Sequence, residues 1–224
     1  MLPVWVVVAG MTVLGTAVPV VLHHRTHGVL SVNQMGMAFF FWLNTIIAFW
    51  EICLFLRIDG IRDQYESYKQ QYAGREFDRV IDFFKSKMPV TQLFSTKRWA
   101  DVWASYSLFD ESYANKKSFG FFIDIGNGFT TLIPSLVYIY GITFQFIPAR
   151  ALGILGLLIS YQMFYGTAVY FTSYLMNRRY RGHSLVTAAG FVGLSNGLWT
   201  FFPLWGMALS VQMIYGDNFG AFLG

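Results

Sequence analysis

The sequence has little charge and almost no cysteine. Only 12% of its 224 residues are Asp, Glu, Lys or Arg, whereas an average soluble domain has about 25%. Apolar residues make up 55% of the chain and aromatic residues 19%. Its single cysteine, Cys53, excludes an intrachain disulfide and a cysteine-based metal site. This composition indicates an integral membrane protein rather than a water-soluble one.

The sequence also lacks the short motifs of several common enzyme classes. It has no GxSxG, no HExxH and no glycine-rich phosphate loop, which argues against hydrolase, zinc-protease and nucleotide chemistry. Three of its four histidines stand close together, but His23 and His24 are adjacent and point apart, and no acidic residue is near them. We expect a solvated loop there rather than a metal site. Neither a metal nor a cofactor is therefore expected.

Five apolar runs are each long enough to cross the ~30 Å hydrocarbon core as a helix, which takes about 20 residues. Because lipid offers backbone amides no other partner, each run is predicted to be helical. The first run has no basic leader and no small-residue cleavage site, which favours a retained span; a cleaved signal peptide is the alternative. The prediction is an all-α integral membrane bundle in one domain, residues 1–224, with spans at about 4–22, 36–57, 119–141, 150–176 and 185–213.

The one long polar segment, residues 58–118, lies between the second and third runs. Charged and apolar residues alternate at helical spacing from Arg62 to Lys87, which predicts an amphipathic helix at the membrane interface. This segment, with Arg57 just before it, and the 177–183 loop hold all but two of the sixteen Lys and Arg residues. The positive-inside rule then places both in the cytoplasm, and we expect the N-terminus outside. The basic residues are dispersed among membrane-grade apolar runs, so no nucleic-acid partner is expected.

Two carboxylates, Glu51 and Asp124, fall inside predicted spans. A charged side chain at the bilayer centre costs about 3 kcal/mol or more unless it is paired, protonated or in a wet cavity, so intramembrane acids usually mark function. The alternative is that one or both lie at the boundary and reach water. If both face one cavity, they form a coupled pair, one acid and one base. Such a pair can move a proton on and off an alkene.

Three further residues in the predicted spans are candidates for the same site: Asn127, Asn196 and Trp199. Asn127 lies one turn after Asp124 and could orient its carboxylate. In the last span, Asn196 and Trp199 share a helix face. Trp199 offers a π-face that would stabilise a cation without trapping it. The alternative for Trp199 is packing, or contact with lipid in an aromatic belt.

Four spaced blocks occur in one order: Trp103-x-x-Tyr106-x-x-x-Asp110-x-x-Tyr113, then Asp124, then Tyr165-Gly166-x-x-Val169-Tyr170-Phe171, then Asn196-Gly197-Leu198-Trp199-x-x-x-Pro203. Together they resemble the emopamil-binding (EXPERA) family, which includes the sterol Δ8-Δ7 isomerases. The resemblance covers roughly residues 36–213. It implies a ligand cavity among five helices, with Glu51 and Asp124 as catalytic acids and Asn127, Tyr165, Asn196 and Trp199 as substrate-binding residues.

The chain departs from the isomerases at Ile47, where they have a histidine four residues before the second-helix Glu, and at Asp124, where they have Glu. We therefore expect an intramembrane isomerase or cyclase acting on a sterol or isoprenoid. A non-catalytic lipid-binding or trafficking protein of the same fold is the alternative, and solute transport is a third. The expected partners are that ligand and membrane lipids, and a homodimer is left open. The expected location is the endoplasmic reticulum membrane in a eukaryote or the inner membrane in a bacterium.

Overall fold

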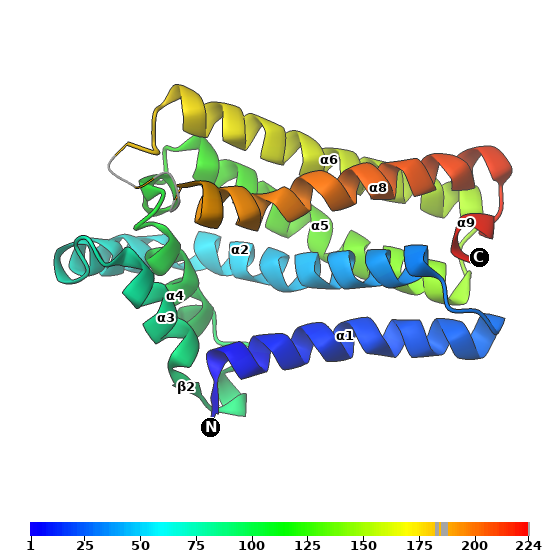
Figure 1. The fold of residues 1–224 in the computed structure, drawn as a ribbon, viewed down its shortest axis with the longest axis horizontal. Helices are drawn as coiled ribbons and strands as arrows, with labels where there is room; N and C mark the ends of the chain where they lie inside the picture. Colours follow the sequence, from blue (N-terminus) through cyan, green and yellow to red (C-terminus); the bar gives the residue numbers. More distant parts are fainter. Residues whose placement is uncertain (182–183, 185–187, 224) are drawn as a thin grey trace. The chain divides into compact units, whose positions relative to one another are not determined.

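A computed structural model describes residues 1–181, 184 and 188–223 (Figure 1). This part of the chain is mostly helical, with turns between the helices and two short paired strands, β1 (Leu2–Pro3) and β2 (Lys87–Met88). Within it, five helices are long and apolar enough to cross a membrane. This confirms the predicted all-α membrane fold. The helices are α1 (Val4–His27), α2 (Val32–Gln71), α5 (Phe119–Phe144), α6 (Ala149–Met176) and α8 (Leu194–Gly216).

The helix boundaries follow the hydropathy pattern closely in α5 and α6. Helix α8 is preceded by a π-helical turn, η3 (Ala188–Gly193). The start of the predicted span at 185–213 and the end of the predicted 177–183 loop lie outside the described residues. Helix α1 continues to His27, so the histidine cluster is helical and not a loop.

Helix α2 is too long to be only a membrane span. Its 40 residues correspond to ~60 Å at 1.5 Å per residue, about twice the hydrocarbon thickness. The helix is kinked at Arg57, whose φ of −128° and ψ of 15° are not helical. This kink coincides with the predicted end of the second span. The arm from 58 to 71 therefore belongs to the polar segment.

The polar segment folds as short helices joined by turns. The predicted single helix from Arg62 to Lys87 is wrong, because a turn at residues 72–75 divides it and Gly74 there has a φ of +72°, which favours glycine. Helix α3 is amphipathic as expected, with Arg79 and Phe83 buried. The elements of this segment are α3 (Glu76–Lys85), β2, η1 (Val90–Gln92), α4 (Thr96–Tyr106) and η2 (Glu111–Ala114).

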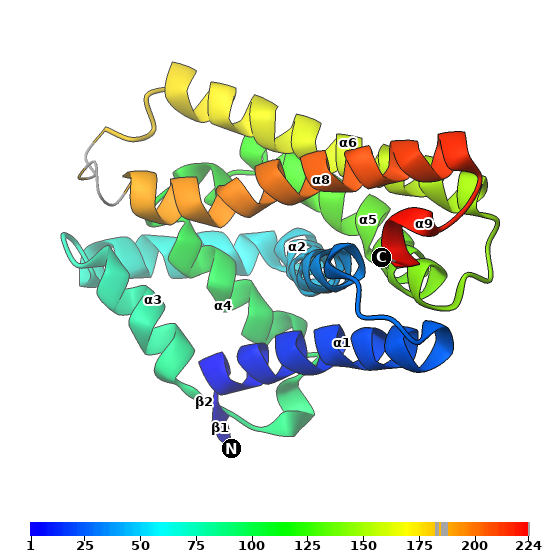
Figure 2. The ribbon, with the colours of Figure 1, turned by 45° about the vertical axis from the view of Figure 1, so that its right-hand side comes forward.

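The chain divides into two compact units, and most of the spanning helices contribute residues to both. The first unit comprises residues 1–10, 48–129 and 169–195. Helices α3 and α4 lie side by side in it (Figure 2). Its core contains Trp50 stacked on Trp99 at 5.1 Å between ring centroids, and the Trp103 indole donates to the Trp50 carbonyl over 2.7 Å. The prediction of one domain stays a prediction.

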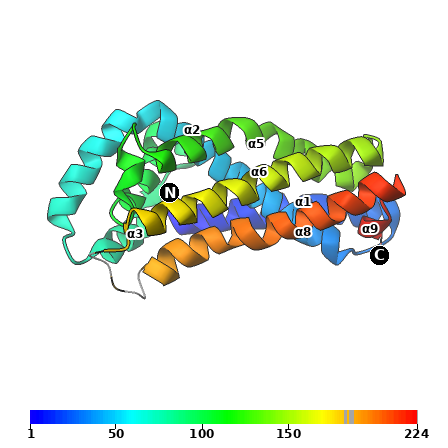
Figure 3. The same cartoon turned by 90° about the horizontal axis from the view of Figure 1, so that it is seen from above.

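The second unit comprises residues 11–47, 130–168 and 196–224. Aromatic and aliphatic side chains from α2, α5, α6 and α8, among them Phe40 and Tyr138, form its core. The short helix α9 (Gly220–Leu223) packs beside the end of α1 (Figure 3), where the Phe222 carbonyl lies 3.0 Å from His23 Nε2. His23 is buried, so the expectation of a solvated histidine loop is wrong for this residue.

The N-terminus lies on the same side of the membrane as the polar segment. Leu2 pairs with Met88 in the β1–β2 ladder, and the Val4 N–H donates to the Ser86 carbonyl over 3.0 Å. This corrects the expectation of an N-terminus opposite that segment. The physical reason is that two spans separate them, and two crossings return the chain to its starting side.

Candidate functional site

Glu51 lies in the membrane-spanning part of α2 and is buried, with 4% of its surface exposed. The Asn127 side chain on α5 donates a hydrogen bond to Glu51 Oε2 over 2.8 Å. The helices approach closely enough for this bond because Gly128 has no side chain. A Cβ on Gly128 would lie 2.9 Å from the Ala48 carbonyl oxygen and 2.8 Å from the Glu51 Cβ. Asn127, which lies one turn from the second acid, Asp124, thus holds the carboxylate of the first acid, Glu51.

Asp124 lies one turn before Asn127 on α5, near enough to Glu51 for their charges to repel each other. The Tyr113 hydroxyl in η2 hydrogen-bonds with Asp124. Burial, followed by the charge of Asp124, raises the pKa of Tyr113 well above its usual range. Its hydroxyl therefore keeps its proton and acts as the donor. Each intramembrane acid has one neutral hydrogen-bond donor, which holds the carboxylate without neutralising it.

Aromatic side chains surround Tyr113. Its ring centroid lies 5.1 Å from that of Trp103, 5.1 Å from that of Tyr106 and 6.2 Å from that of Tyr170. Three of these residues come from the first motif block and Tyr170 from the third. These motif residues therefore form one aromatic cluster. The sequence showed only their spacing and did not indicate that they pack together.

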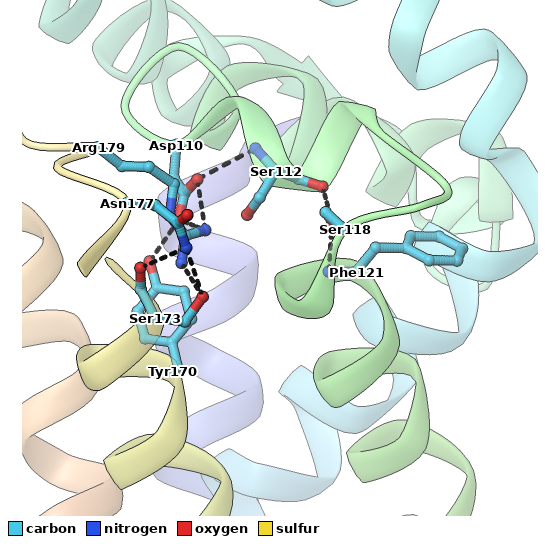
Figure 4. A network of polar contacts seen from close by, with 8 residues as sticks. All are labelled: Asp110, Ser112, Ser118, Phe121, Tyr170, Ser173, Asn177 and Arg179. Atoms are coloured by element: carbon cyan, nitrogen blue, oxygen red, sulfur yellow. Dashed lines mark hydrogen bonds and ion pairs between the residues drawn. The ribbon is translucent and has the colours of Figure 1, made fainter. Parts of the chain in front are cut away.

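A buried ion pair holds η2 to the end of α6 (Figure 4). Arg179 Nη1 donates to both carboxylate oxygens of Asp110, over 3.0 and 2.8 Å. The Tyr170 hydroxyl donates to Asp110 Oδ2 over 2.8 Å, and the Ser112 N–H donates to Oδ1 over 3.0 Å. Because Asp110 is the N-cap of η2, this network fixes the turn that carries Tyr113. Sequence reasoning assigned Arg179 only to the basic loop.

Tyr165, Asn196 and Trp199 belong to the second unit. The Trp199 indole donates to Asn44 Oδ1 over 3.0 Å, and the Asn44 amide donates to Thr131 over 2.9 Å and to Ser135 over 3.1 Å. Tyr165 is 53% exposed and its ring stacks on that of Tyr161. The predicted single cavity containing these residues and the acids stays a prediction.

The candidate site can be compared with what a metal centre would need. Among the described residues, no group of three or more His, Cys, Asp or Glu side chains could hold a metal ion. Cys53 is two residues from Glu51 and is buried as a free thiol. The described site contains two carboxyl groups, an amide and a phenol.

Gly128→Ala should destabilise the protein, whereas Gly126→Ala should not. The added methyl at 128 would press on the α2 backbone, and overpacking of this kind costs about 1–3 kcal/mol. At Gly126 nothing lies within 4 Å of a Cβ, so helix propensity favours alanine by about 1 kcal/mol. The measurement is thermal unfolding in detergent, followed by dye labelling of the Cys53 thiol as it becomes exposed. Equal unfolding temperatures for the two variants would show that the close approach at Gly128 is unimportant.

The four motif blocks occupy both units. The first block lies in the first unit, together with Asp124, Tyr170, Asn127 and Glu51. The last block lies in the second unit. The resemblance to the emopamil-binding family rests on these blocks alone, because no family model matches the sequence and no curated protein or solved structure matches it either.

Proposed function

We propose that this membrane protein is an intramembrane isomerase or cyclase that acts on a sterol or isoprenoid by proton transfer. The observation that carries the proposal is the pair of intramembrane acids, Glu51 on α2 and Asp124 on α5, which lie on two helices joined by the hydrogen bond from Asn127 to Glu51. None of the ion pairs among the described residues involves either acid. Protonation or contact with a wet cavity would lower the energy of such a pair in lipid.

The proposed reaction uses one carboxyl group as acid and the other as base. The acid gives its proton to one alkene carbon, so a C–H bond forms as the π-bond breaks and a carbocation results. In an isomerase, the carboxylate then removes a proton from a neighbouring carbon, and the electrons of that C–H bond form the new double bond. In a cyclase, a second alkene attacks the cation first and a C–C bond closes a ring before the proton is lost.

Two neighbouring side chains support these roles. The Asn127 amide donates to Glu51 Oε2 and leaves the other carboxyl oxygen available for proton exchange. Tyr113 is the hydrogen-bonding partner of Asp124. Neither donor carries a positive charge, so neither fixes its acid permanently in the ionised form. A general acid and base must be able to take both forms in turn.

A lipid-binding protein without chemistry is the second candidate. It is favoured by Ile47, which stands where the resembling isomerases have the histidine next to the acid. The same acids would then serve only to bind a polar group of the ligand. On either proposal, the positive-inside rule places the polar segment and the N-terminus in the cytoplasm.

Incubation in heavy water with a panel of sterols and prenylated compounds tests the reaction. A proton-transfer isomerase or cyclase must place deuterium from solvent in its product, since the added proton comes from an exchangeable carboxyl group. Mass spectrometry of the recovered lipids detects the added deuterium and any change in retention time. Tight binding of a sterol with no deuterated product would overturn the enzyme proposal in favour of lipid binding.

A further inference from the structure

We propose that the turn formed by residues 89–94, here called the η1 turn, docks on the membrane leaflet. Val90 and Phe94 enter the apolar zone of the bilayer, and neighbouring lysines contact anionic phospholipid headgroups. The turn lies within the polar segment. From the sequence, only the helix that precedes this turn was expected at the membrane interface. This inference does not depend on the proposed reaction.

Two contacts fix the level of the η1 turn relative to the membrane spans. The residue preceding β2, Ser86, accepts a hydrogen bond from Val4, the first residue of α1. At the other end of the turn, the Phe94 ring lies edge-on to Phe49, with 6.2 Å between centroids. Phe49 lies eight residues before the Arg57 kink, or ~12 Å inside the span at 1.5 Å per residue. Phe94 therefore lies at the depth of the bilayer.

Two apolar side chains of this turn are largely exposed. Phe94 is 79% exposed and Val90 is 76% exposed, whereas Met88 just before them is buried. Leu2, in the strand β1 that pairs with β2, and Trp5, at the start of α1, are about half exposed. Large exposed apolar side chains on neighbouring segments mark a protein or membrane interaction site, and their depth beside a span favours lipid. Tryptophan at such a boundary is typical of membrane interfaces.

The surrounding charge fits an anionic lipid surface. Lys85, Lys87 and Lys97 are exposed on either side of the turn. A hollow of about 280 Å³ adjoins the turn, and its lining residues are Gln64, Gln92, Ser95, Lys97, Arg98 and Asp101. Basic side chains next to an inserted apolar group are the usual means of binding anionic headgroups. A phospholipid therefore matches both the apolar and the basic parts of this surface.

Spin labels on the turn test its depth. Single cysteines are introduced as Val90→Cys and Phe94→Cys, with Thr91→Cys and Gln92→Cys as matched controls in the same turn. The native Cys53 is buried, so wild-type protein reports the labelling background. The labelled protein is reconstituted in vesicles of phosphatidylcholine with phosphatidylglycerol. Labels at 90 and 94 should relax severalfold faster with oxygen and slower with a water-soluble nickel chelate than labels at 91 and 92.

Two outcomes would overturn the proposed insertion, and one further measurement tests the headgroup part. Equal nickel accessibility at all four positions would mean that the turn faces water. Shielding of positions 90 and 94 from both reagents would mean that a second copy or another protein covers them. Omission of phosphatidylglycerol should raise nickel accessibility at 94 in the wild-type background, and Lys87→Gln with Lys97→Gln should remove that difference. No effect of the anionic lipid would overturn the headgroup assignment.

Discussion

Glu51→Gln and Asp124→Asn should each abolish deuterium transfer from heavy water into product while leaving the fold and ligand binding largely intact. Each change keeps the shape of the side chain but removes its exchangeable acid proton. Loss of general acid–base catalysis lowers rates by about 10²–10⁴. Turnover is measured as deuterated product by mass spectrometry, and binding as ligand retained on the purified variant.

The hydrogen bonds at the site explain why folding should survive. In Glu51→Gln the new amide oxygen can still accept from Asn127, and in Asp124→Asn the new amide oxygen can still accept from Tyr113. Asp63→Asn is the matched control, because Asp63 is an exposed acid on the outer arm of α2. It should retain the wild-type rate. A wild-type rate in either Glu51→Gln or Asp124→Asn would remove that residue from the mechanism, even if the protein proved to be an enzyme.

The spanning helices could be predicted because their signal is local. A run of about 20 apolar residues has one stable structure in lipid, and α5 and α6 begin and end near the predicted residues. Glu51 and Asp124 could be selected for the same reason, since a carboxylate in such a run is costly wherever the chain then packs. The N-terminal side could also have been predicted from the sequence, by counting crossings.

The remaining errors and omissions concern contacts between distant residues. His23 is buried because α9, almost two hundred residues later, supplies the Phe222 carbonyl. Asp110 and Arg179 are 69 positions apart, and no periodicity links them. The motif around Asp110 was visible, but its role depends on where α6 ends. The turn at Gly74 was missed because helical spacing of apolar residues continues on both sides of it.

Asp110→Asn should destabilise the protein more than Glu51→Gln, Asp124→Asn, Asp63→Asn or Asp59→Asn. The Asp110 side chain is fully buried and the Arg179 side chain is 13% exposed. Removal of one partner leaves the guanidinium charge in a poorly solvated place, which costs about 3–5 kcal/mol for a buried pair. The Tyr170 and Ser112 donors would also lose a charged acceptor. Thermal unfolding in detergent, followed by Cys53 labelling, measures the effect.

Asp59→Asn provides the matched control for this prediction. Asp59 also forms an ion pair, with Lys116 at 2.7 Å, but both side chains are more than half exposed. Exposed pairs contribute about 1 kcal/mol or less, so its unfolding temperature should change little. The double variant Asp110→Asn with Arg179→Gln should recover part of the loss, because it leaves no unpaired charge. If Asp110→Asn is no less stable than Asp59→Asn, the ion pair does not hold η2, and Tyr113 must be positioned by its aromatic neighbours and by Asp124.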